Sequence, residues 1–359
     1  MNRWSQFSWG RTCIELALGT SIALLLYLAT MNFIVGKSFL FSVDTKRIIE
    51  VYKFCSSMKA TPHKEANFII GSSVAVEGID ADLLDQTLHN GTNTYNLGVV
   101  GLSPVEALIL GPALKAGKPQ FVVIGIDAMS VGVGQTENTE KESIDFEKLQ
   151  AYRAMNPIAQ MDSPVKKELL ENILLPKEKA ILESHYLGYL LGCRSLPIFF
   201  MEGKLRELTR KGLRTQGIVT NFKSPWMLKV NLTGDSKERI INSAIGVAQG
   251  LSFDGDSRNI KALRALTRLL QAENIALMLV VWPLHPRILS HLHAELLDKT
   301  DTTLKALAQE SESNYLNYSK LLSDTDFADA LHPNSEGRAK LSIKLAEDIK
   351  SFSAHLSTP

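Results

Sequence analysis

The chain has 359 residues, which is enough for one large domain or for two. Its 39 basic and 38 acidic residues leave almost no net charge, which argues against nucleic acid as the main partner, because nucleic-acid binding depends on clustered basic residues. With three cysteines, no Cys-x-x-Cys pair and no His-Glu-x-x-His helix, the sequence predicts no metal site and no cofactor.

The N-terminal segment has the length and composition of a membrane span. Residues 16–35 carry no charge, and roughly 20 such residues cross a hydrocarbon core. The alternative is a cleaved signal peptide, but the run exceeds the usual apolar region of about 7–15 residues and no Ala-x-Ala site follows it. Arg3 and Arg11 precede the run and favour an N-terminus inside the cell. We therefore expect a membrane anchor over residues 1–36, with a single pass through the cytoplasmic membrane and the body of the protein outside the cytoplasm.

A juxtamembrane segment is expected over residues 37–64, with a short helix around 48–54. After it, apolar strands alternate with helix signals. Strands are predicted at 67–71, 92–97 and 120–127. An N-cap at Asp80 starts the helix after the first strand, and a capping box over residues 103–106 starts the next. Strand, helix, strand, helix, strand at this spacing predicts right-handed crossovers and a parallel sheet.

The alternation is lost between about residues 130 and 256. Helices are predicted around 145–155 and 165–210 within this stretch. Both an inserted helical region and a face against another membrane protein fit the pattern. The sequence does not decide between the two.

Strands and helices then alternate again to the end of the chain. A helix with an apolar face over 260–270 precedes a buried strand at 275–281. A helix over 287–310, a short strand at 315–318 and a final helix after Pro333 complete the series. The whole pattern predicts an α/β fold with a three-layer, doubly wound parallel sheet and the flavodoxin-like strand order.

A serine, a histidine and a carboxylate fall at the expected strand ends. Ser72 and Ser73 follow the first strand, and Asp329 and His332 stand three residues apart before the final helix. Ligands of such sheets bind beyond the carboxyl ends of the strands, where a histidine can remove a serine proton and a carboxylate can orient the histidine. Taken singly, a serine there is more often a turn or N-cap residue, and a His-Pro pair before a helix is more often a capping arrangement.

Together these stretches resemble the SGNH, or GDSL-type, hydrolase superfamily. The resemblance lies in the Gly-Ser-Ser of residues 71–73, the Asn-Leu-Gly-Val-Val-Gly of 96–101, and the Asp-x-x-His-Pro of 329–333 followed by Gly337. Serine in the first block and Asp-x-x-His in the last is also the family's chain order.

The resemblance implies a role for each matching residue. Ser73 would be the nucleophile, and His332 and Asp329 would complete a catalytic triad. The backbone N–H groups of Ser73 and Gly101 would form the oxyanion hole. The family's third block ends in an asparagine that donates to the oxyanion, whereas this chain has Asp127 there. Because an ionised carboxylate cannot donate, Asp127 is expected either to stay protonated or to contact the acceptor instead.

The anchor and the inserted middle resemble one branch of that superfamily, which includes the D-alanyl transfer protein of teichoic acid modification and the alginate O-acetyltransferases. The two SGNH-like halves would be residues 65–130 and 257–359, and residues 131–256 would be the insertion. This resemblance implies an extracytoplasmic acyltransferase that moves an O-acetyl or similar group onto an envelope polysaccharide or glycolipid through an acyl-Ser73 intermediate. A membrane-bound O-acyltransferase would be its partner.

Two other functions stay open at this stage: an anchored carbohydrate esterase or deacetylase, and a non-catalytic envelope assembly factor with an SGNH-like fold. Cys55 and Cys193 would be able to pair in an oxidising compartment, although nothing in the sequence brings them together. His285, His291 and His293 are expected to be exposed residues of a helix or loop.

Overall fold

The computed structural model of the protein describes residues 9–36, 42–58, 66–89, 91–134, 143–183, 222–223 and 231–356. The chain divides into two compact units. One comprises Met1–Lys46 and Glu183–Gln216, and the other comprises Arg47–Leu182 and Gly217–Pro359. The larger unit contains both predicted halves of the α/β fold and every residue of the candidate site. The finer boundaries drawn from the sequence stay a prediction.

The larger unit is built on a five-stranded parallel sheet, as the alternating pattern predicts. Across the sheet the order is β2 (Asn93–Asn96), β1 (Ala66–Ile70), β3 (Phe121–Ile126), β6 (Ala276–Val281) and β7 (Asn314–Asn317). Counted along the chain, this is the flavodoxin-like order 2-1-3-4-5. The strand order reverses between β1 and β3, so the crevice that usually binds ligands opens beyond the carboxyl ends of these two strands.

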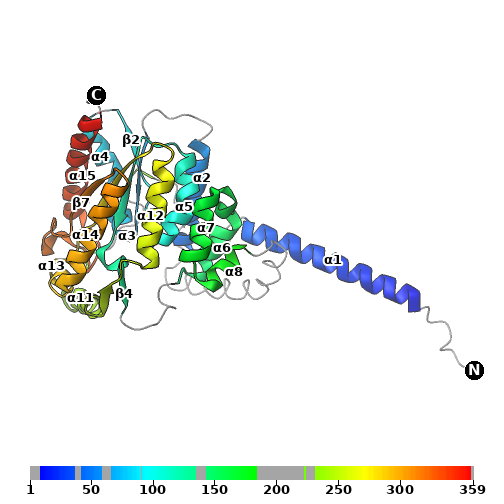
Figure 1. Ribbon diagram of the computed structural model, residues 1–359. Coiled ribbons are helices and arrows are strands. Elements are labelled where there is room, and N and C mark those ends of the chain that lie inside the picture. The colour runs from blue at the N-terminus through cyan, green and yellow to red at the C-terminus, as the bar shows by residue number, and fades with distance from the viewer. Residues whose placement is uncertain are drawn as a thin grey trace, which may run out of the picture. The chain divides into compact units, whose positions relative to one another are not determined.

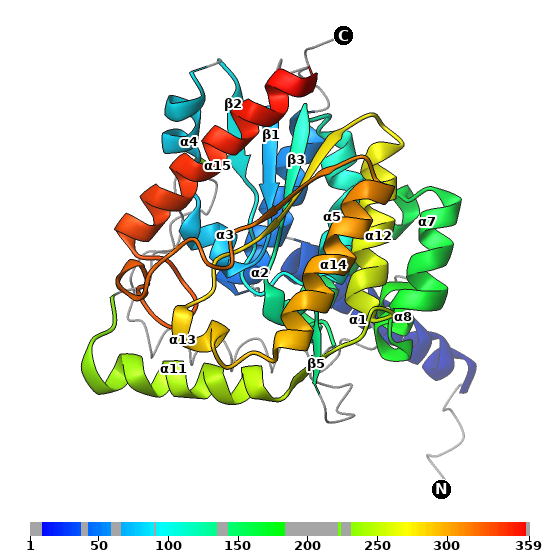
Figure 2. The same cartoon turned by 60° about the vertical axis from the view of Figure 1, so that its left-hand side comes forward.

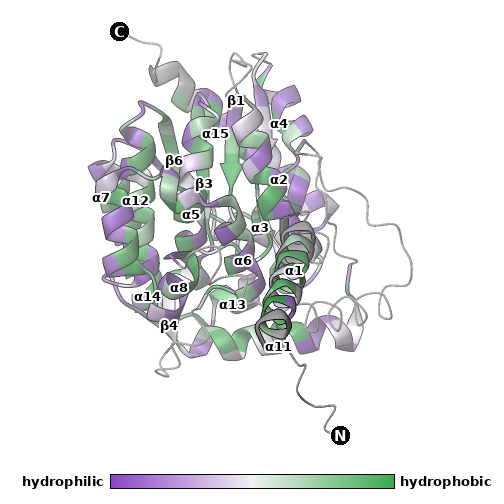
Figure 3. Ribbon diagram, turned by 90° about the vertical axis from the view of Figure 1, so that its right-hand side faces the viewer, coloured by the Kyte–Doolittle hydropathy of each residue, from purple (hydrophilic) through white to green (hydrophobic). Residues whose placement is uncertain are grey.

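Helices cover both faces of the sheet (Figure 1). One face packs against α2 (Val43–Met58), α5 (Pro104–Ala116), α12 (Arg258–Gln271) and α14 (Ala294–Glu310). The other packs against α3 (Ser73–Gly78), α4 (Ala81–Leu88) and α15 (Ser335–Leu356). Successive residues of a strand point to opposite faces, so Ile70 of β1 joins the first core and Ile69 joins the second. In Figure 3, β1 carries hydrophobic colour, and the covering helices α4 and α7 carry hydrophilic colour.

Local capping signals place the helix starts where the sequence predicts them. The Asp80 carboxylate accepts a hydrogen bond from the backbone N–H of Leu83 and begins α4. Ser103 and Glu106 form a reciprocal capping box at the start of α5. The single helix predicted over 287–310 is instead two helices, α13 (Pro286–Leu289) and α14, because the chain turns over the four residues between them.

The inserted region begins and ends as a pair of antiparallel strands, β4 (Gly132–Gly134) and β5 (Leu251–Phe253), and the short helix η1 (Ala128–Ser130) leads into β4. Between the strands, short helices pack outside α5 and α12, and α11 packs beside α13 (Figure 2). These helices are α6 (Phe146–Met155), η2 (Pro157–Gln160), α7 (Ser163–Glu168), η3 (Leu169–Ile173), α8 (Pro176–Glu183) and α11 (Gly234–Gln249). The helix predicted at 145–155 is confirmed. The one predicted at 165–210 is a series of shorter helices as far as residue 183, and its remainder lies outside the described residues.

The predicted membrane span falls within α1 (Trp9–Gly36), in the smaller unit. Among the residues that the structure describes, no helix combines the length and the apolar character that crossing a membrane requires. The anchor therefore remains a prediction from the sequence. Within the expected juxtamembrane segment, α2 forms the predicted short helix, while residues 37–41 and 59–65 lie outside the described residues. Cys193 also lies outside them, so its pairing with Cys55 stays open.

Candidate active site

The chain turns from β1 directly into α3, and the two serines at this turn have different roles. Ser72 is the N-cap of α3: its Oγ atom accepts a hydrogen bond from the backbone N–H of Val74 at 3.3 Å. Ser73 is the first residue of the helix. Ser72 is thus the capping serine that an isolated serine at a strand end usually is, and this frees Ser73 for another role.

Ser73, His332 and Asp329 form one chain of hydrogen bonds. The Nε2 atom of His332 lies 2.9 Å from Ser73 Oγ. On the other side of the ring, Nδ1 lies 2.9 Å from each carboxylate oxygen of Asp329. Ser73 is partly buried, and the His332 and Asp329 side chains are each only 10% exposed. The structure therefore brings together the three side chains that the sequence predicts as a triad, with a geometry that suits proton transfer from serine to histidine.

Asp329 is held in its ionised form. Burial works against ionisation, but the hydrogen bond and electrostatic attraction of His332, together with the backbone N–H groups of Leu331 and His332, outweigh it and lower the pKa of Asp329 to about 2. A carboxylate in this state accepts from Nδ1–H of the ring, which leaves Nε2 as the atom that can receive a proton from Ser73.

The loop that carries Asp329 and His332 is fixed by its own backbone. The N–H of Ala328 donates to the carbonyl oxygen of His332 at 2.8 Å, and Phe327 pairs with Pro333 as an isolated antiparallel bridge. The short helix η5 (Asp324–Asp326) precedes it. At Gly337 a Cβ atom would lie 2.2 Å from the carbonyl oxygen of Asp326, so only glycine lets α15 start this close to the loop. This contact is the physical reason for the glycine that follows the Asp-x-x-His motif.

Asn96, at the end of β2, ties the Gly101 loop to the helix that begins with Ser73. Its buried amide donates to the carbonyl oxygens of Ala75 at 2.8 Å and Ile79 at 3.0 Å. Its side-chain oxygen accepts from the backbone N–H of Gly98 at 3.0 Å. Gly101 itself has a φ of +62°, which glycine adopts readily and other residues rarely do. The two backbone segments expected to bind an oxyanion are therefore linked through one side chain.

The inserted region reaches this loop through Lys148 of α6. Its Nζ atom donates to the carbonyl oxygen of Gly101 at 2.8 Å and pairs with Glu106 at 3.1 Å. Tyr152, one turn later, donates to the same Glu106 carboxylate at 3.3 Å. Residues of the insertion thus help to hold the loop that carries Gly101, a contact that the sequence does not predict.

Trp282 fills the space that two glycines leave at the sheet edge. A Cβ atom at Gly125 would lie 2.1 Å from the indole ring, and one at Gly71 would lie 3.0 Å from its Nε1 atom. The ring is almost fully buried. Gly71 and Gly125, which stands two residues before Asp127, are therefore required by packing under the site, whatever chemistry takes place above it.

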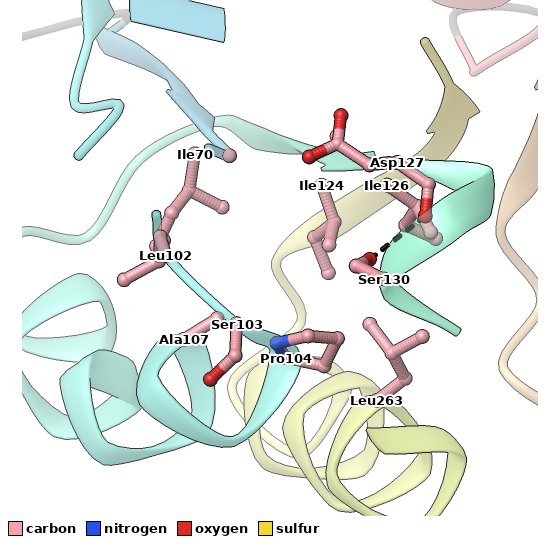
Figure 4. Close-up of a pocket in the computed structure, with 12 residues that line it drawn as sticks. Ile70, Leu102, Ser103, Pro104, Ala107, Ile124, Ile126, Asp127, Ser130 and Leu263 are labelled. Atoms are coloured by element: carbon pink, nitrogen blue, oxygen red, sulfur yellow. Dashed lines mark hydrogen bonds between the residues drawn. The ribbon is translucent and has the colours of Figure 1, made fainter. Parts of the chain in front are cut away.

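Asp127 follows β3 at the rim of the site, beside the same crevice. Burial raises its pKa, and a hydrogen bond with Ser72 and the charge of His332 oppose this shift only in part. Below it lies a cavity of about 10 Å³, room for about one water molecule. Figure 4 shows the Asp127 carboxylate on the far side of this cavity from Pro104 and Leu263. Leu102, Ile124 and Gly71 also line the cavity.

Glu77 belongs to the site although the sequence did not predict it, and the burial of His285 differs from its prediction. Glu77 is fully buried on α3, with its Oε1 atom 3.8 Å from His332 Nε2. Its spacing of four residues from Ser73 is the signal for a shared helix face, but α3 was not predicted because its valines favour a strand. His285, expected to be exposed, is buried and caps α13 by accepting from the N–H of Arg287.

Among the described residues, no group of three or more His, Cys, Asp or Glu side chains is placed to hold a metal ion. No protein-family model matches the chain, and no curated protein matches its sequence. A similar solved structure is that of Est24, a carbohydrate acetylesterase from Sinorhizobium meliloti. The alignment covers 80% of this chain and 100% of that one, with 10% sequence identity and a TM-score of 0.35. At this level of similarity no role passes from one protein to the other.

Proposed function

We propose that this protein is a serine-dependent acyltransferase that moves a short acyl group through an acyl-Ser73 intermediate. The observation that carries the proposal is the 2.9 Å contact between His332 Nε2 and Ser73 Oγ, in a histidine whose other nitrogen is held by an ionised Asp329. A serine is a weak nucleophile unless a base takes its proton, and this arrangement supplies that base.

In the first half of the proposed reaction, His332 Nε2 takes the Oγ proton while Oγ bonds to the carbonyl carbon of the acyl donor. The negative charge that develops on the carbonyl oxygen would be held by the backbone N–H groups of Ser73 and Gly101. The donor's C–O bond then breaks, and the leaving oxygen takes the proton from His332. The products of this half are acyl-Ser73 and the donor alcohol.

In the second half, a hydroxyl group attacks acyl-Ser73. The hydroxyl gives its proton to Nε2 as its oxygen bonds to the acyl carbon, and Ser73 leaves and recovers the proton. Water in this role gives hydrolysis, and a sugar hydroxyl gives transfer. Binding and orienting the acceptor lowers the activation barrier by roughly 7–11 kcal/mol relative to an acceptor that diffuses in, which is enough to outcompete water.

Asp127 favours transfer over plain hydrolysis in this proposal. Where the resembling family has an oxyanion-donating asparagine, this chain has a carboxyl group, and removing one such donor costs roughly 100- to 1000-fold in rate. A carboxylate can instead accept a hydrogen bond from an acceptor hydroxyl. The esterase alternative requires efficient hydrolysis without that donor, and the assembly-factor alternative has no use for the bonded Ser73, His332 and Asp329.

The acyl group, the acceptor and the location are further parts of the proposal. The cavity beside Gly71 and Asp127 has room for about one water molecule, and we assign it to the end of a short acyl group such as acetyl. An envelope polysaccharide or glycolipid as acceptor, a membrane-bound O-acyltransferase as partner, and an anchored position outside the cytoplasm all rest on the sequence resemblance. The location can be tested with a reporter that is active only outside the cytoplasm, fused after Pro359. An inactive reporter, or a protein found only in the soluble fraction, would contradict the location.

The direct test is covalent labelling of the full chain with a fluorophosphonate, which reacts with activated serines. We expect labelling of the wild type on Ser73, no labelling of Ser73→Ala, and continued labelling of Ser72→Ala. An unlabelled wild type, or label on Ser72, would contradict the proposal. Hydrolysis of a small acetyl ester should then be slow and should give way to acyl transfer when an oligosaccharide is added.

A further inference from the structure

Ser73 and Glu77 lie one helical turn apart on α3, and both face the same nitrogen of His332. Ser73 Oγ is 2.9 Å from Nε2, and Glu77 Oε1 is 3.8 Å from it. Glu77 is fully buried, whereas carboxylates are rarely buried without a function or a charged partner. The ring of His332 thus lies between two acidic residues, Asp329 on the Nδ1 side and Glu77 on the Nε2 side.

We propose that Glu77 is a positioning residue that acts through His332: its charge stabilises the imidazolium that forms when Nε2 takes the proton of Ser73. This inference rests on the proposed function, because it assigns the role of Glu77 in the same reaction. Glu77 neither bonds to the substrate nor accepts the proton. It makes His332 a stronger base at the moment that Ser73 attacks.

A carboxylate this close to the ring, and this deeply buried, changes how readily the ring binds a proton. An opposite charge within about 4–6 Å favours the charged form of a group by roughly one to three pH units, and burial reduces the screening by water. At 3.8 Å the carboxylate is too far for a strong hydrogen bond in the resting site, so it does not compete with Ser73 for Nε2. It is near enough to act once the ring carries a positive charge.

Other charged groups around the ring are part of the same balance. Asp329 faces the ring from its own loop, and Asp127 interacts with His332 from the end of β3. On α15, Arg338 donates through Nε to the backbone carbonyl oxygen of Glu77 at 2.5 Å. Its positive charge, which also interacts with Asp80 at the start of α4, allows a carboxylate to remain in this buried place. The competing explanation is that Glu77 only ties α3 to α15.

The two explanations differ in how the activity depends on pH. In the full chain carrying Glu77→Gln, we expect the acid limb of the rate of fluorophosphonate labelling to move to lower pH, by roughly one to three pH units, with a lower plateau rate. The matched control is Asp80→Asn, which also removes a carboxylate facing Arg338 but keeps the N-cap of α4. Asp80→Asn should leave the acid limb within a few tenths of a pH unit of its wild-type position. If Glu77 had only a structural role, Glu77→Gln would lower the stability of the protein without moving the acid limb.

A second measurement does not require catalysis. In Ser73→Ala protein, the titration midpoint of the His332 ring can be followed by NMR with and without Glu77→Gln. We expect a lower midpoint without the carboxylate, and an unchanged midpoint would overturn the inference even if Ser73 is a nucleophile. Conversely, a shifted midpoint in a protein that is never labelled would refute only the proposed function. If Glu77→Gln does not fold, Glu77→Asp should give a smaller shift in the same direction, and no shift would again overturn the inference.

Discussion

His332 Nε2 lies 2.9 Å from Ser73 Oγ, although 259 residues separate the two in the chain. Ser73 follows β1, and His332 lies in the loop after β7, three strands away in the sheet. At a spacing of about 4.8 Å between strands, that loop must cross roughly 14 Å of the sheet's carboxyl edge. The bridge between Phe327 and Pro333 shapes the loop so that it returns over the crevice between β1 and β3. The site thus depends on the whole width of the sheet.

The hydrogen-bonded chain predicts how variants combine. Ser73→Ala should abolish acyl transfer, and His332→Ala and Asp329→Ala should each reduce the rate of transfer by roughly ten-thousand-fold while the protein still folds. Because the three act as a unit, a double variant should lose little more than the worse of its single variants. Ser72→Ala is the matched control. It removes the N-cap of α3 and should lower the stability by about 1 kcal/mol, but it keeps Ser73 and should therefore stay active. Additive losses in the double variant would contradict a shared role.

The lowered pKa of Asp329 predicts a pH-dependent part of the stability. Its folded pKa of about 2 is below the ordinary value of 3.8, so its ionised form stabilises the fold above about pH 4. That contribution, about 2 kcal/mol, is lost as the pH falls from about 4 towards 2. Urea unfolding at a series of pH values should show wild type more stable than Asp329→Asn at pH 7, with the difference shrinking by about this amount near pH 2. A difference that does not change with pH would contradict the argument.

Asp127 is predicted to set the balance between transfer and hydrolysis. Asp127→Asn keeps an oxygen that can accept from Ser72 and adds an amide that can donate to the oxyanion. We expect hydrolysis of a small acetyl ester to rise by up to roughly 100-fold, and transfer to an added oligosaccharide to rise less or fall. The measurement is the ratio of free acetate to acetylated acceptor. Rapid hydrolysis by the wild type, indifferent to any glycan, would leave an ordinary esterase.

The small cavity predicts a preference for short acyl groups. Leu102 lines it and is largely buried, so Leu102→Ala should enlarge it. The rate on a butyrate ester relative to an acetate ester should then rise by roughly tenfold or more, because the enlarged cavity can accommodate one or two further methylene groups. Leu108→Ala is the control, because Leu108 is buried in the same core but does not line the cavity. Both variants should lose about 2–5 kcal/mol of stability, so an equal change in the ratio would contradict this role of the cavity.

The sequence by itself determined the five strands of the parallel sheet, the starts of several helices and the residues of the hydrogen-bonded chain. These features are local: β1 and β3 are short buried runs rich in β-branched and aromatic residues, the capping residues Asp80 and Ser103 act within one turn, and the serine follows a predicted strand while the Asp-x-x-His motif stands just before a predicted helix. Period and capping depend on neighbouring residues alone, so they can be read without a structure.

Only the tertiary structure decided which groups surround His332. Glu77 enters the site because α3 forms despite its valines, held by the cap from Ser72 and by Asn96 from another strand. Lys148 reaches Gly101 from an inserted helix, and Trp282 requires Gly125 across the sheet. Such contacts join residues far apart in the chain, and neither local propensity nor period carries information about them. These contacts are set by packing, because the buried positions that hold a charged group or an aromatic ring exist only once the sheet has assembled.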